Sequence, residues 1–140
     1  MEVLQTMAYF KIEDLLVACF GNMDMSEEDL VVWLERLSRP DWEKLLLSAR
    51  GCGTMSAKQR SRMLEMYKEY KKKYNINPKI AMVSNALFPR LVTNALSMLL
   101  GLEIKAFRLS ELSESVSYLG AQIEAPRLQE ALDKAHRHVD

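Results

Sequence analysis

The chain has 140 residues, the length of one ordinary domain and enough to bury a sizeable core. Hydrophobic residues make up 49% and charged residues 27%, a globular balance that excludes a disordered or membrane-embedded chain. Lysine and arginine total 19, and so do aspartate and glutamate, so the net charge is zero and the molecule as a whole is not a polyanion binder.

The first part of the chain predicts a hairpin followed by an acidic helix. Met7–Ile12 and Leu15–Phe20 are short apolar runs separated by two acidic residues, a pattern typical of two strands joined by a tight turn. Ser26 is expected to cap a helix whose first turn carries three acids, where the helix dipole favours them. Trp33 lies on the apolar stripe of this helix, and Pro40 closes it.

Two buried strands flank a long basic helix in the middle of the chain. Leu45–Ala49 and Ile80–Val83 are continuously apolar, which predicts parallel strands near the centre of a sheet and covered on both faces. Ser56 and Gln59 form a capping box that opens the helix between them. Its apolar stripe runs through tyrosines and methionines to Tyr74.

The last part of the chain continues the alternation of helix and strand. The predicted elements are a helix over Phe88–Leu99, a strand over Ile104–Phe107, a short helix over Leu112–Leu119, and a final helix that packs through Leu128, Leu132 and Ala135. The whole pattern predicts one α/β domain over residues 1–140, with a core at about 7–120 and a C-terminal helix at about 125–139. Its sheet would be mostly parallel, with about five strands and one or two helical layers.

This order of elements, with a loop and then a helix after the third strand, resembles the STAS-like family of anti-sigma-factor antagonists and sulfate-transporter tails. The likeness covers about Met7 to Gly120 and is nearest to the stand-alone bacterial members, where a final strand leads into a helix ended by Leu-Gly. Such a resemblance implies a non-enzymatic domain that binds another protein. Some members are switched by phosphorylation of a serine in an Asp-Ser-Ser-Gly pattern. Here the matching segment is Thr54-Met55-Ser56-Ala57, which keeps one serine and lacks the acid.

The candidate site is the edge of the sheet where the parallel strands end and helices begin. Glycines there would free backbone N–H groups, and arginines would supply guanidinium groups for an anion. The alternative is a plain connection between elements. Ser56 is a candidate phosphorylation site, or only the cap of its helix. The predicted ligand- or partner-binding residues are Arg50, Gly51, Gly53, Thr54, Ser56, Arg60, Ser84, Asn85 and Arg90.

The charges are separated along the chain. Residues 24–35 hold five acids and no base, whereas residues 58–73 hold seven bases and two acids. Val31 and Val32 widen the apolar arc of the acidic helix, which can indicate a partner contact. The tyrosines of the basic helix lie on its apolar stripe, so no aromatic platform for nucleic acid is expected.

Two cysteines, Cys19 and Cys52, are too few for a disulfide framework, and no metal-ligand spacing is visible. His136 and His138 are two residues apart and would point in different directions on a helix. No signal peptide or membrane-spanning run is present, so we expect a cytoplasmic protein without a metal, a cofactor or a membrane contact.

The sequence therefore favours a non-enzymatic regulatory or adaptor domain that docks a partner protein through the loop after the third strand and the basic helix. No nucleophile–base pair or catalytic carboxylate pair is recognisable. The alternatives are a protein that binds a small anionic or lipophilic ligand through Arg50, Thr54, Ser84, Asn85 and Arg90, and a structural homodimer.

Overall fold

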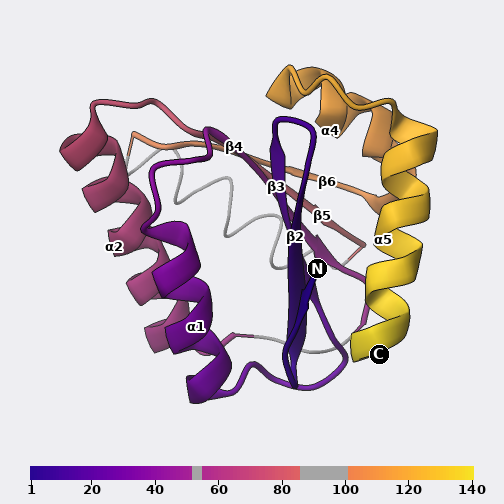
Figure 1. Ribbon diagram of the computed structural model, residues 1–140, viewed down its shortest axis with the longest axis horizontal. Coiled ribbons are helices and arrows are strands. Elements are labelled where there is room, and N and C mark those ends of the chain that lie inside the picture. Colours follow the sequence, from indigo (N-terminus) through magenta and orange to yellow (C-terminus); the bar gives the residue numbers. More distant parts are fainter. Residues whose placement is uncertain (52–54, 86–100) are drawn as a thin grey trace.

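The computed structural model describes residues 1–51, 55–85 and 101–140 (Figure 1). In this part of the chain, six strands form one sheet whose spatial order follows the sequence, β1-β2-β3-β4-β5-β6. The pairs β1–β2 and β2–β3 are antiparallel, whereas β3, β4, β5 and β6 run parallel to one another. The strands are β1 (Glu2–Val3), β2 (Met7–Ile12), β3 (Leu15–Phe20), β4 (Lys44–Ala49), β5 (Lys79–Ser84) and β6 (Glu103–Phe107).

The N-terminal hairpin is confirmed with the predicted bounds. Ile12 pairs with Leu15 across a turn of two residues, and Glu13 adopts a positive φ of 53° there. Tight hairpin turns require positive φ because their twist must match that of the strands. The two-residue strand β1 was not predicted, since a segment this short carries no periodic signal.

Helices cover both faces of the sheet, so of the two arrangements that the sequence left open, one or two helical layers, the structure has two (Figure 1). Strands β3, β4 and β5 lie side by side in chain order and run in the same direction. Right-handed crossovers between them therefore place the connecting helices α1 and α2 on the same face of the sheet. The helices that follow β6 cover the opposite face. The described helices are α1 (Glu27–Leu37), α2 (Ala57–Tyr74), the 3₁₀ turn η1 (Leu109–Glu111), α4 (Leu112–Leu119) and α5 (Ala125–Val139). The predicted helix Phe88–Leu99 lies outside the described residues.

The core has two halves because side chains alternate along each strand. Leu45 and Leu47 of β4 pack with Trp33 on the α1/α2 side, whereas Leu46 packs with Leu128 on the α5 side. All five are buried, which confirms that β4 is covered on both faces. The predicted stripe of α5 is also confirmed, since Leu128, Leu132 and Ala135 are buried against the sheet.

Both predicted helix caps are present. The Ser26 hydroxyl accepts the backbone N–H of Asp29 at the start of α1. At the start of α2, Ser56 Oγ accepts the N–H of Gln59, and the Gln59 side chain accepts the N–H of Ser56 in return. This reciprocal pairing satisfies two donors that a helix N-terminus would otherwise leave open.

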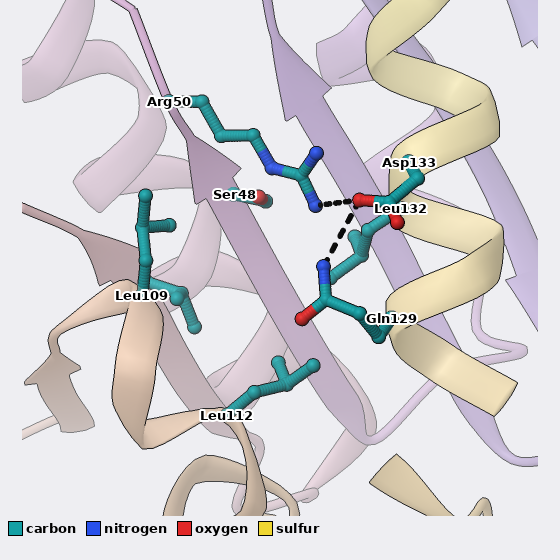
Figure 2. Close-up of a pocket in the computed structure, with 8 residues that line it drawn as sticks. Ser48, Arg50, Leu109, Leu112, Gln129, Leu132 and Asp133 are labelled. Carbon is teal, nitrogen blue, oxygen red and sulfur yellow. Dashed lines mark hydrogen bonds and ion pairs between the residues drawn. The ribbon is translucent and has the colours of Figure 1, made fainter. Parts of the chain in front are cut away.

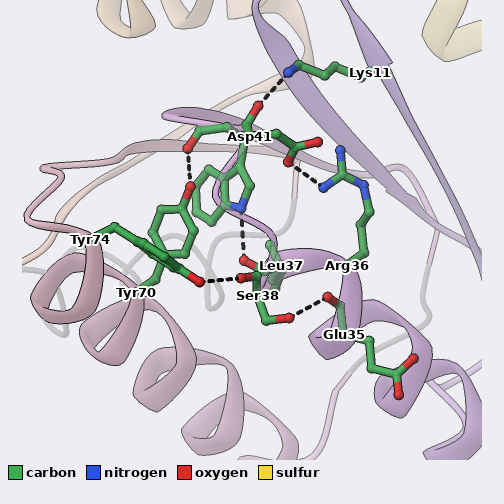
Figure 3. Close-up of polar contacts among 9 residues, drawn as sticks. Lys11, Glu35, Arg36, Leu37, Ser38, Asp41, Tyr70 and Tyr74 are labelled. Carbon is green, nitrogen blue, oxygen red and sulfur yellow. Dashed lines mark hydrogen bonds and ion pairs between the residues drawn. The ribbon is translucent and has the colours of Figure 1, made fainter.

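Hydrogen bonds and a stacked ring pair in the turn between α1 and β4 connect α1 to α2 (Figure 3). The Trp42 indole N–H donates to the Leu37 carbonyl at 2.9 Å, and its ring stacks on Tyr70 of α2 with centroids 4.5 Å apart. The Tyr70 hydroxyl donates to the Trp42 carbonyl, and Arg36 pairs with Asp41 at 2.8 Å. These contacts fix the two helices relative to each other.

Candidate functional site

A pocket of about 170 Å³ lies on the α5 side of the sheet, at the carboxyl end of β4 (Figure 2). Leu46, Ser48 and Arg50 are two residues apart, so the strand places all three on the face that α5 covers. Helix α5 supplies the opposite wall. The pocket is lined by Ser48, Arg50, Val83, Leu109, Leu112, Gln129, Leu132 and Asp133.

An ion pair spans the pocket between β4 and α5. Arg50 Nη2 lies 2.7 Å from Asp133 Oδ1, and Gln129 Nε2 donates to the same oxygen at 3.0 Å (Figure 2). These hydrogen bonds from Gln129 and Arg50 lower the pKa of Asp133, so the carboxylate is charged at neutral pH. The Arg50 and Asp133 side chains are 26% and 47% exposed, so the pair is open to solvent on one side.

A buried serine–histidine pair lies beside this ion pair. Ser48 Oγ is 2.9 Å from His136 Nε2, and the two residues are 0% and 2% exposed. Asp140 Oδ2 lies 3.6 Å from the other ring nitrogen, which favours the tautomer with its proton on Nδ1 and with Nε2 accepting from Ser48. Burial and the nearby Arg50 guanidinium lower the pKa of His136, so the ring is neutral at neutral pH.

The chemistry of the pair is limited by its burial. A serine, a histidine and a carboxylate in this order resemble the arrangement that activates a nucleophile. Ser48, however, is 0% exposed although it borders the pocket, and the Asp140 contact is too long for a hydrogen bond. The pair therefore joins α5 to β4. Cys19, the partner of Ser48 across the β3–β4 pairing, is a free buried thiol whose pKa burial raises to about 12.

Of the predicted site residues that the structure describes, only Arg50 lines the pocket. Ser84 is buried at the end of β5, but strand alternation turns it away from Val83 and hence from the pocket face. Asn85 instead accepts the backbone N–H of Leu109 through its side chain at 3.1 Å, which connects β5 to η1. Ser84 and Asn85 therefore lie at the same edge of the sheet as Arg50, but neither of them lines the pocket.

The other predicted residues have local contacts. Gly51 makes room for Asn22, because a Cβ at this position would lie 1.5 Å from Asn22 Oδ1. Ser56 caps α2, and Arg60 donates to the carbonyl of Met55 at 2.8 Å. Gly53, Thr54 and Arg90 lie outside the described residues.

Four polar residues of the pocket and of the serine–histidine pair were not among the predicted site residues, namely Ser48, Gln129, Asp133 and His136. A signal for two of them was present. Ser48 is two residues beyond the inward-facing Leu46, and His136 is four residues beyond Leu132, so each continues a buried stripe with a polar side chain. His138, by contrast, is exposed, which agrees with the expected divergence of the two histidines.

A second surface consists of the outward sides of α1 and α2, here called the α1/α2 face. On α1, Val31 and Val32 are 48% and 37% exposed, whereas the neighbouring Trp33 is fully buried. On α2, the side chains of Lys58, Lys68 and Lys72 are exposed and bond to no residue that the structure describes. This face also includes Glu28, Glu35, Glu65 and Glu69.

The sequence was compared with models of known protein families and with curated proteins, and it matches none of them. Among the described residues, no helix is both long and apolar enough to cross a membrane. In residues 1–51, 55–85 and 101–140, no three His, Cys, Asp or Glu side chains are grouped so that they could hold a metal ion.

Proposed function

We propose that this protein is a non-enzymatic regulatory or adaptor domain that binds a partner protein through the α1/α2 face. The observation that carries this proposal is the exposure of Val31 and Val32 beside the buried Trp33. Val31 and Val32 are adjacent apolar side chains on the solvent side of an otherwise amphipathic helix, and the part of their surface that stays exposed contributes nothing to folding. They would contribute to binding when a partner covers them.

The charges on this face suggest the chemistry of the partner. Glu28 and Glu35 flank the valines on α1, and three lysines without side-chain partners among the described residues lie along α2. A complementary surface would place apolar groups on the valines, basic groups beside α1 and carboxylates over α2. Such an arrangement speeds encounter and fixes orientation more than it strengthens the complex.

The rigidity of the face also supports binding. Trp42 and Tyr70 join the end of α1 to α2, and Glu27 accepts from both Gln59 and Arg62 at the other end. Two helices held at both ends lose little conformational freedom when a partner docks, which reduces the entropic cost of association.

The resemblance to STAS-like domains agrees with this proposal, since those domains bind proteins. The N-terminal hairpin, the parallel strands and the helix after the third long strand are consistent with that family. The buried free thiol of Cys19 agrees with action in the reducing cytoplasm. In this proposal Ser56 is first a helix cap, and a phosphate there would add negative charge at the N-terminus of α2.

Substitution of the exposed valines tests the proposal. The variant Val31→Asp/Val32→Asp and the parent are used as bait in lysate of the native host, and proteins retained by the parent are quantified by mass spectrometry. Val3→Asp is the matched control, because Val3 is 45% exposed and belongs to β1, a strand that contacts α5. The proposal predicts a partner retained by the parent and by Val3→Asp but lost from the double variant. Equal retention by all three proteins would contradict it.

A further inference from the structure

The lining of the pocket under α5 combines one positively charged side chain, one negatively charged side chain and several apolar side chains. Asp133 Oδ1 accepts from Arg50 and Gln129, while Asp133 Oδ2 has no partner among the described residues. Arg50 has five N–H donors, and Asp133 is its one ion-pair partner among the described residues, which leaves donors for a ligand that enters the pocket. Three leucines, one valine and Ser48 form the rest of the lining. Figure 2 shows the leucines and Ser48 around the ion pair.

The size of the pocket restricts its occupant. Its volume of about 170 Å³ is close to that of engineered cavities of roughly 150 Å³ that take up benzene. Pockets for drug-sized ligands are larger, at roughly 300–1,000 Å³. A nucleotide or a long acyl chain is therefore too large, whereas a molecule with one short branched chain fits.

We propose that this pocket binds a small free α-amino acid with a branched aliphatic side chain. The carboxylate of the ligand would accept from the open N–H groups of Arg50, and its ammonium group would donate to Asp133 Oδ2. Its side chain would lie against Leu109, Leu112 and Leu132. A simple carboxylate fits less well because Asp133 would repel it, and a simple amine fits less well because Arg50 would.

This site is separate from the α1/α2 face. The pocket lies on the α5 side of the sheet, whereas α1 and α2 cover the opposite side (Figure 1). The inference therefore does not depend on the proposed partner binding, and either can fail alone.

Titrations with three related molecules test the inference. Methyl resonances of Val83, Leu109, Leu112 and Leu132 are followed in NMR spectra as L-leucine, isocaproate or isoamylamine is added. Isocaproate lacks the ammonium group and isoamylamine lacks the carboxylate. The proposal predicts saturable shifts with L-leucine and affinities about tenfold or more weaker for the other two, the loss expected for one charged hydrogen bond.

Variants of the ion pair complete the test. Arg50→Met and Asp133→Asn should each weaken L-leucine binding about tenfold or more. Arg127→Met is the matched control, since Arg127 also lies in an ion pair that includes α5 but points away from the pocket lining. Should Arg50→Met fail to fold, Asp133→Asn decides alone. The proposal is overturned if L-leucine causes no shifts, if isocaproate binds as tightly, or if a folded variant binds like the control.

Discussion

Two adjacent residues of α5 should respond very differently to replacement by alanine. Leu128 is fully buried against the sheet, whereas the neighbouring Arg127 is 59% exposed and pairs with Glu13 at 2.6 Å. Leu128→Ala removes buried methyl groups and leaves a cavity, which costs about 2–5 kcal/mol. At this chain length the melting temperature should fall by roughly 8 to 20 °C. Arg127→Ala removes one solvent-exposed ion pair, for which the cost is about 1 kcal/mol or less.

Differential scanning calorimetry, with urea denaturation as a second measurement, compares the two variants with the parent protein. The expected result is a large loss of stability for Leu128→Ala and a change of a few degrees at most for Arg127→Ala. Comparable losses for the two variants would mean that the buried stripe of α5 does not hold this helix to the sheet.

Three further predictions concern the buried pair, the helix cap and the basic residues. Because the pKa of folded His136 lies below its ordinary value of 6.5, the unfolded chain takes up a proton that the folded chain does not. The free energy of unfolding should therefore fall as the pH drops below 6.5, and His136→Gln should flatten this slope in urea titrations; an unchanged slope would contradict the assignment. Ser56→Ala should cost about 0.5–2 kcal/mol, whereas Ser56→Asp, which also caps, should cost little, and equal losses in thermal melts would argue against a capping role. Replacing Lys58, Lys68 and Lys72 by glutamate should slow association with the partner and change its salt dependence in stopped-flow experiments, whereas Lys134→Glu on α5 should not; equal rates for both variants would exclude α2 from the interface.

The fold was predictable where periodicity extends over a whole element. The hairpin, the two central strands, the Ser26 cap and the one predicted capping box, at Ser56, follow from local patterns, and the structure confirms them. The stripe of α5 was equally clear, since Leu128 and Leu132 recur at helical spacing. Strand β1 was missed because two residues contain no period.

The candidate site was less predictable because it depends on distant contacts. Arg50 was identified from its place after β4, but its partner Asp133 is 83 residues further along the chain and belongs to another element. The sequence also placed Ser84 at the same edge, and only the alternation of side chains on β5 shows that it faces the other side. Apolar stripes indicate which face of an element is buried, but they do not show which two buried faces meet.

The central claim is that a partner protein covers the α1/α2 face, and hydrogen–deuterium exchange of the isolated complex tests it most directly. Binding should slow exchange in peptides from α1 around Val31 and Val32 and from α2 between Lys58 and Lys72, and should leave α5 unchanged. Protection confined to peptides with Gly51, Asn85 or α5, and none on α1, would contradict it and move the interface to the edge of the sheet.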